Sequence, residues 1–170
     1  MFIRMFVEIA VVAPRKIAVL CPPLILLFVV SLTVCAAGYL RIRQREDTMP
    51  EPGNPAELKP ALIFGALYAL VLLAIAAARE YFGNRGIYVV ALISGFTDVD
   101  AITLSTANLS AAGSMEPDTA WRAMVIASLA NLAFKTSAAG VLGGKPLLLS
   151  LLALFSIPFT AGLAVLWLWP

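Results

Sequence analysis

The sequence predicts an all-α, polytopic membrane protein with about five transmembrane helices, on three observations. Of its 170 residues, 61% are hydrophobic and 13% are charged, whereas a soluble domain is typically about 45–50% apolar and about 25% charged. The apolar residues form long runs, and a membrane-spanning helix needs about 20 of them in a row. Two aspartates, Asp98 and Asp100, interrupt one of these runs. We therefore expect residues 17–170 to form a single membrane domain with one broken helix.

The chain begins with a short apolar stretch and a first span. Residues 1–16 contain Arg4 and Glu8 and are too short and too charged to cross a bilayer, so we expect an interfacial helix or the remnant of a longer one. Residues 17–40 form the first predicted span. Pro22 and Pro23 lie near its start, where a helix tolerates proline. A polar loop follows, and because it is rich in proline, no regular element is expected there.

Four further spans are predicted over 60–78, 87–109, 121–142 and 146–169. Polar or glycine-containing turns separate them, and tryptophans at the start of the fourth and the end of the fifth fit the aromatic belts of a membrane protein. Pro158 is expected to kink the last span.

Composition excludes several classes of function. The chain has no histidine, which removes histidine-based metal sites and serine–histidine–aspartate catalysis. Its few cations lie in short loops, so we expect no nucleic acid partner. Cys21 and Cys35 lie about 21 Å apart along one predicted helix, too far to form a disulfide within the chain.

Asp98 and Asp100 are the main functional signal. A carboxylate at the centre of a bilayer costs at least about 2.5–3.5 kcal/mol, so such an acid indicates a functional site by default. Counted from residue 87, the two acids lie about 16 and 20 Å into the third span. Counted from residue 121, Asn131 and Lys135 lie about 15 and 21 Å into the antiparallel fourth span. All four are therefore expected at a similar depth, with Lys135 near the acids.

The spacing of the two acids predicts an irregular backbone. Residues two apart on an ideal helix point about 200° away from each other, so both acids can face one site only if the helix breaks. Gly95 marks the expected break, and Asp98 is placed to cap a following half-helix. Transporters bind ions and solutes at such discontinuous helices.

These observations define a candidate site for a cation or small polar solute. Asp98 and Asp100 are the candidate metal ligands or proton carriers, Lys135 is the counter-charge, and hydroxyl and amide groups supply neutral oxygen ligands of the kind that hard cations prefer. The complete set of expected binding residues is Thr97, Asp98, Asp100, Thr103, Ser105, Asn108, Asn131 and Lys135. No cofactor is expected other than a bound divalent or monovalent cation.

Two other interpretations stay open. The acids and Lys135 can form an ion pair that only stabilises helix packing, with Asn131 as a polar contact between helices. The protein would then be a non-transporting structural or regulatory membrane subunit. A membrane enzyme is the third interpretation. We expect no enzymatic activity, because no nucleophile, histidine or intramembrane protease or transferase motif accompanies the acids.

The segment from Gly95 to Ser105 reads GFTDVDAITLS and is followed by Asn131 and Lys135; the chain also contains Asn54-Pro55, Glu57-Leu58 and Tyr81-Phe82-Gly83. In these motifs, most specifically the first, the chain resembles the C-terminal membrane domain associated with MgtC/SapB-type proteins, the domain of unknown function numbered 4010. The resemblance implies a multi-pass protein of the bacterial or archaeal inner membrane, linked by association to magnesium-related or other ion transport.

Family members usually carry a further membrane domain and additional helices before this point. The chain is accordingly expected to be a fragment, a short paralogue or one half of an assembly. Besides the lipid bilayer, we expect its partners to be further copies in a homo-oligomer or another membrane domain.

Overall fold

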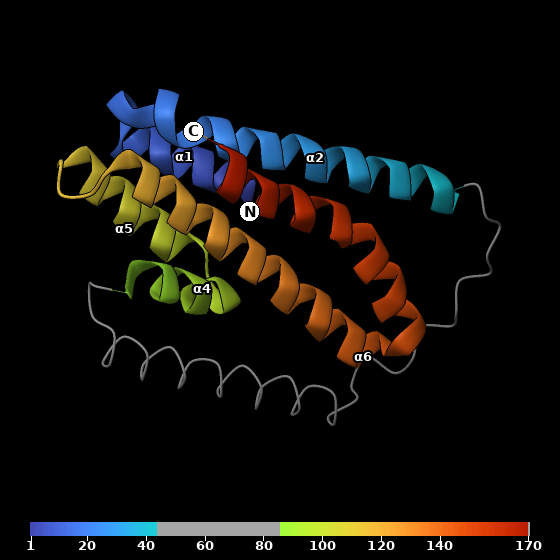
Figure 1. The fold of residues 1–170 in the computed structure, drawn as a ribbon. Helices are drawn as coiled ribbons and strands as arrows, with labels where there is room; N and C mark the ends of the chain where they lie inside the picture. The colour runs from blue at the N-terminus through green and yellow to red at the C-terminus, as the bar shows by residue number, and fades with distance from the viewer. Residues whose placement is uncertain (44–85, 170) are drawn as a thin grey trace.

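The computed structural model describes residues 1–43 and 86–169 of the chain (Figure 1). Every regular element in this described part is a helix, which confirms the all-α prediction. The elements in chain order are α1 (Phe2–Val12), the short 3-10 helix η1 (Pro14–Lys16), α2 (Ile17–Arg43), α4 (Ile87–Thr97), α5 (Asp100–Ala111) and α6 (Pro117–Leu168).

Three stretches of helix are long and apolar enough to cross a membrane: Pro14–Leu40, Pro117–Val141 and Gly143–Leu168. They correspond to the spans expected over 17–40, 121–142 and 146–169. The span expected over 60–78 lies outside the described residues. The protein is therefore an all-α membrane protein.

Helix α6 contains two of these stretches, joined by a sharp bend. Gly144 has φ 79° and ψ 176°, a backbone conformation that residues with a Cβ rarely adopt. Pro146 follows in the first turn of the second arm, where its missing N–H is tolerated. The second arm returns toward the end of the molecule at which the first arm begins (Figure 1).

Helices α4 and α5 form a hairpin rather than one crossing. They have 11 and 12 residues, so each is about 16–18 Å long, roughly half the thickness of a bilayer core of about 30 Å. Helix α5 turns back toward the side of the molecule at which α4 begins (Figure 1). The third span expected over 87–109 thus breaks at the predicted place, between Thr97 and Asp100, but the chain reverses there instead of continuing.

Helices α1 and α6 pack against this hairpin. Helix α4 packs on the first arm of α6, and α1 packs along α5. The first 16 residues, expected to be an interfacial or remnant helix, form α1 and η1. Met5 and Ile9 of α1 are fully buried in the same apolar core as Trp121 and Met124 of α6. The N-terminal helix is therefore part of the membrane domain's core.

A candidate ion-binding site at the break between α4 and α5

The break between the two half-helices is built around Asp98. Its backbone is extended, with φ −149° and ψ 126°, and its N–H donates to the Ser94 carbonyl oxygen over 2.8 Å to close the last turn of α4. Its carboxylate oxygen Oδ1 accepts the backbone N–H of Asp100, the first residue of α5, over 3.0 Å. Because the first N–H groups of a helix have no partner within it, Asp98 satisfies one of them, as the sequence predicts.

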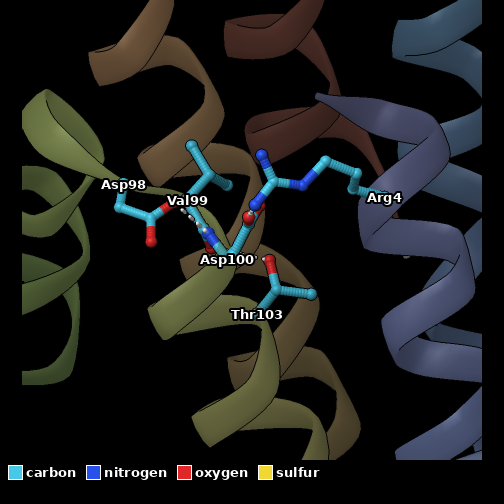
Figure 2. A network of polar contacts seen from close by, with 5 residues as sticks. All are labelled: Arg4, Asp98, Val99, Asp100 and Thr103. Atoms are coloured by element: carbon cyan, nitrogen blue, oxygen red, sulfur yellow. Dashed lines mark hydrogen bonds and ion pairs between the residues drawn. The ribbon is translucent and has the colours of Figure 1, made fainter.

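Asp100 forms an ion pair with Arg4 of α1. The Asp100 residue is 8% exposed, whereas the Arg4 side chain is 71% exposed. The Asp100 carboxylate points toward the Arg4 guanidinium, while Asp98 lies on the other side of Asp100, away from Arg4 (Figure 2). The buried charge is thereby compensated by a residue from a different helix.

The two aspartates do not converge on one ligand position. Asp98 is exposed and Asp100 is buried against Arg4, since the break does not rotate the two side chains onto a common face. Within residues 1–43 and 86–169, no group of three or more His, Cys, Asp or Glu side chains is arranged to hold a metal ion. Joint ligation of a metal by Asp98 and Asp100 stays a prediction, and Asp98 is the carboxylate left open to a ligand.

Asn131 and Gly95 join α4 to α6 beside the break. The Asn131 side-chain Nδ2 donates to the Gly95 carbonyl oxygen over 2.9 Å, which gives a partner to one of the carbonyls left free at the end of α4. Gly95 lies so close to α6 that a Cβ on it would stand 2.3 Å from the Ala127 carbonyl oxygen. The sequence prediction that Asn131 lies at the depth of the break is consistent with this contact.

The hydroxyl groups of three expected neutral ligands donate hydrogen bonds to the backbone of their own helices. Thr97, Thr103 and Ser105 donate to the backbone oxygens of Ser94, Val99 and Ile102 respectively. Their oxygens still carry free lone pairs. Thr103 is fully buried beside the Arg4–Asp100 ion pair, whereas Ser105 and Asn108 are exposed further along α5.

Lys135 is exposed on α6, one turn after Asn131. Among the described residues it forms no ion pair with Asp98 or Asp100, so its role as their counter-charge stays a prediction. Arg4 is the residue of this candidate site that sequence reasoning missed. Its signal was a charge within the apolar first segment, which is the same signal that singled out the aspartates.

Glu8 is a further acid on α1, one helical turn after Arg4. Its Oε2 atom is buried and has no hydrogen-bond partner among the described residues.

Comparison with known proteins points to one family. A family model described as "Domain of unknown function (DUF4010)" matches residues 1–143. An uncharacterized protein of Aquifex aeolicus (strain VF5) is 36% identical over 115 residues, which cover 66% of this chain and 50% of that protein. The match therefore spans about half the length of the relative. No solved structure matches the chain.

Proposed function

The chain belongs to the DUF4010 family, and from that premise and the geometry of the break we propose that it binds or transports a cation or a small polar solute across the membrane. The cargo occupies the break between α4 and α5, and Asp98 is its principal ligand. The proposal assigns no catalytic role to the protein.

The exposed carboxylate of Asp98 at the broken helix is the observation that carries this proposal. Irregular backbone at membrane depth is tolerated only where it is buried in protein or lines a water-filled cavity. A carboxylate there costs free energy unless it serves a ligand or a partner. Asp98 is exposed and is in no ion pair of the described residues, so it is free to take a cation.

The neighbouring residues support Asp98 in distinct ways. Arg4 compensates the charge of Asp100, and Asn131 holds the end of α4 against α6. Both contacts keep the break in one geometry. In the proposal, Thr97 and Thr103 contribute neutral oxygens, and Lys135 is a counter-charge that approaches when the site is empty.

The setting we propose is a bacterial inner membrane, with a homo-oligomer or a second membrane domain completing the path for the cargo. The relative comes from a bacterium. The described helices include three that are long enough to span a membrane, and three helices are few for enclosing a permeation path. A further copy or domain would supply the remaining helices around that path.

Flux through reconstituted vesicles tests the proposal. The purified chain is placed in liposomes, and entry of K⁺, Na⁺ and Mg²⁺ is followed with ion-sensitive dyes. We expect flux of at least one ion that Asp98→Asn reduces at least about tenfold, because a contact between two unit charges near a protein surface is worth more than about 1.4 kcal/mol. Glu116→Gln, at an exposed loop acid, is the matched control. Equal flux through the Asp98→Asn and parent proteins would refute transport through this site.

A second candidate is a non-transporting structural or regulatory subunit. The Arg4–Asp100 ion pair and the Asn131–Gly95 hydrogen bond favour it, because they satisfy buried polar groups in the way that purely structural contacts do. If Asp98→Asn folds normally and neither flux nor binding of any tested cation changes, this second function is the correct one.

A further inference from the structure

Arg4 reaches the site from outside the hairpin that forms it. It lies on α1, which packs along α5, and its partner Asp100 is the first residue of α5. The half-helix hairpin therefore supplies the carboxylates, and a separate helix supplies the cation (Figure 2).

The side chain of Arg4 touches Asp100 with only part of its guanidinium. The Arg4 side chain is 71% exposed, whereas the Asp100 side chain is 12% exposed. Arg4 thus neutralises an acid that a mobile cation could reach only by displacing it. Asp98 lies on the other side of Asp100 from Arg4 (Figure 2), so its negative charge is available to the cargo.

The number of free carboxylates decides which cation a site favours. A divalent ion interacts with each added carboxylate twice as strongly as a monovalent ion at the same distance. The high-affinity sites of hard divalent cations accordingly gather several carboxylates, and affinity is tuned by the number of ligand charges. Of the two aspartates at the break, Arg4 compensates the charge of Asp100 and leaves that of Asp98.

We propose that Arg4 is a specificity-determining residue that acts as a tethered cation: its positive charge offsets the negative charge of Asp100, so that the site favours monovalent over divalent cations. This inference rests on the proposed function, because it requires that a cation binds at Asp98. The inference also predicts that the net charge of the Arg4–Asp100 pair, rather than the presence of arginine itself, sets the preference for monovalent over divalent cations.

The test compares Mg²⁺ and Na⁺ affinities of the whole purified chain in detergent by calorimetry, at constant ionic strength. Arg4→Gln frees the Asp100 charge, and we expect it to raise the ratio of Mg²⁺ to Na⁺ affinity at least about tenfold. Arg4→Lys retains the positive charge and is expected to keep the parent ratio. Arg15→Gln removes an exposed cation of η1 and serves as the matched control for loss of one positive charge.

A double variant keeps the test decisive if Arg4→Gln fails to fold. In Arg4→Gln with Asp100→Asn the pair is neutral, as in the parent, so we expect Na⁺ and Mg²⁺ to bind in the parent ratio. An altered ratio in the double variant would overturn the inference, as would an unchanged ratio in a folded Arg4→Gln protein. If neither ion binds the parent protein, or if binding ignores Asp98→Asn, the proposed function itself fails and the inference falls with it.

Discussion

At the scale of single residues, Gly95 permits a close contact between the backbones of α4 and α6. An added Cβ would stand 2.3 Å from the Ala127 carbonyl oxygen and 2.8 Å from the Ala127 Cα. These are backbone atoms, which cannot rotate away as the end of a flexible side chain can. The contact therefore requires glycine and fixes where the break lies against α6.

We predict that Gly95→Ala destabilises the protein by about 1–3 kcal/mol, the usual cost of inserting a methyl group into a packed interior. The matched control is Gly38→Ala, because the atoms nearest a Cβ there belong to the movable side chain of Leu154, with Cδ1 at 3.0 Å. Unfolding of the two variants in detergent, followed by circular dichroism, measures the difference. Equal stabilities would contradict the packing described for α4.

The partners of the Arg4–Asp100 ion pair are unequally buried, so their removal should have unequal consequences. Arg4→Gln leaves an uncompensated carboxylate that is only 12% exposed, and we expect a loss of about 1–3 kcal/mol, below the roughly 3–5 kcal/mol of a fully buried pair. Asp100→Asn leaves an arginine that is largely exposed, so we expect a smaller loss. Unfolding of both variants at one detergent concentration checks the order, and a larger loss for Asp100→Asn would contradict it.

At the scale of secondary-structure elements, the reversal between α4 and α5 determines which side of the membrane each end faces. A single crossing over 87–109 would put Gly86 and Ser114 on opposite sides. A hairpin of two helices that are each about half as long as the bilayer core is thick would put them on the same side. The first arm of α6 is long and apolar enough to cross a membrane, which would put Lys145 on the other side.

Cysteine labelling tests this arrangement in a protein from which Cys21 and Cys35 have been removed. We predict that Gly86→Cys and Ser114→Cys react with an impermeant maleimide from the same side of sealed vesicles, and that Lys145→Cys reacts from the other side. Each variant is its own control when the vesicles are opened with detergent. Labelling of positions 86 and 114 from opposite sides would show that the segment crosses the membrane.

Arg122 secures the end of the second arm of α6 to the start of the first. Its guanidinium donates to the carbonyl oxygens of Leu166 and Trp169 and lies 4.5 Å from the centre of the Trp121 ring. The last carbonyls of a helix lack partners within it, and a cation there also interacts favourably with the helix dipole.

We predict that Arg122→Met increases hydrogen exchange of the amides of residues 163–169 by at least about tenfold, since each of the two lost hydrogen bonds to a charged group is worth about 1.5–3 kcal/mol. Lys145→Met, at an exposed position in the bend of α6, is the control and should leave exchange unchanged. Unaltered exchange in Arg122→Met would show that apolar packing alone holds this end.

At the scale of the whole molecule, the sequence predicted what depends on composition along the chain. Long apolar runs correctly indicated the helices that become α2 and the two arms of α6, and the spacing of Asp98 and Asp100 correctly indicated a broken helix. Asn131 was expected at the depth of the break, and it donates to Gly95 there. These features follow from counting residues along helices.

The direction of the chain after the break could not be predicted in this way. It depends on the extended backbone at Asp98, and composition carries no information on that dihedral angle. The cation paired with Asp100 cannot be predicted for the same reason, because depth counting along a continuing span selects Lys135. The prediction that residues 1–16 lie outside the membrane domain excludes Arg4, whereas α1 packs along α5.

The central claim is that the Asp98 carboxylate at the break binds a cation. The most direct measurement is calorimetric titration of the purified protein with K⁺, Na⁺ and Mg²⁺, repeated on Asp98→Asn and on the Glu116→Gln control. We predict that at least one ion binds the parent and control proteins equally, and that Asp98→Asn weakens this binding at least about tenfold. Identical titrations of the parent protein and Asp98→Asn would contradict the claim.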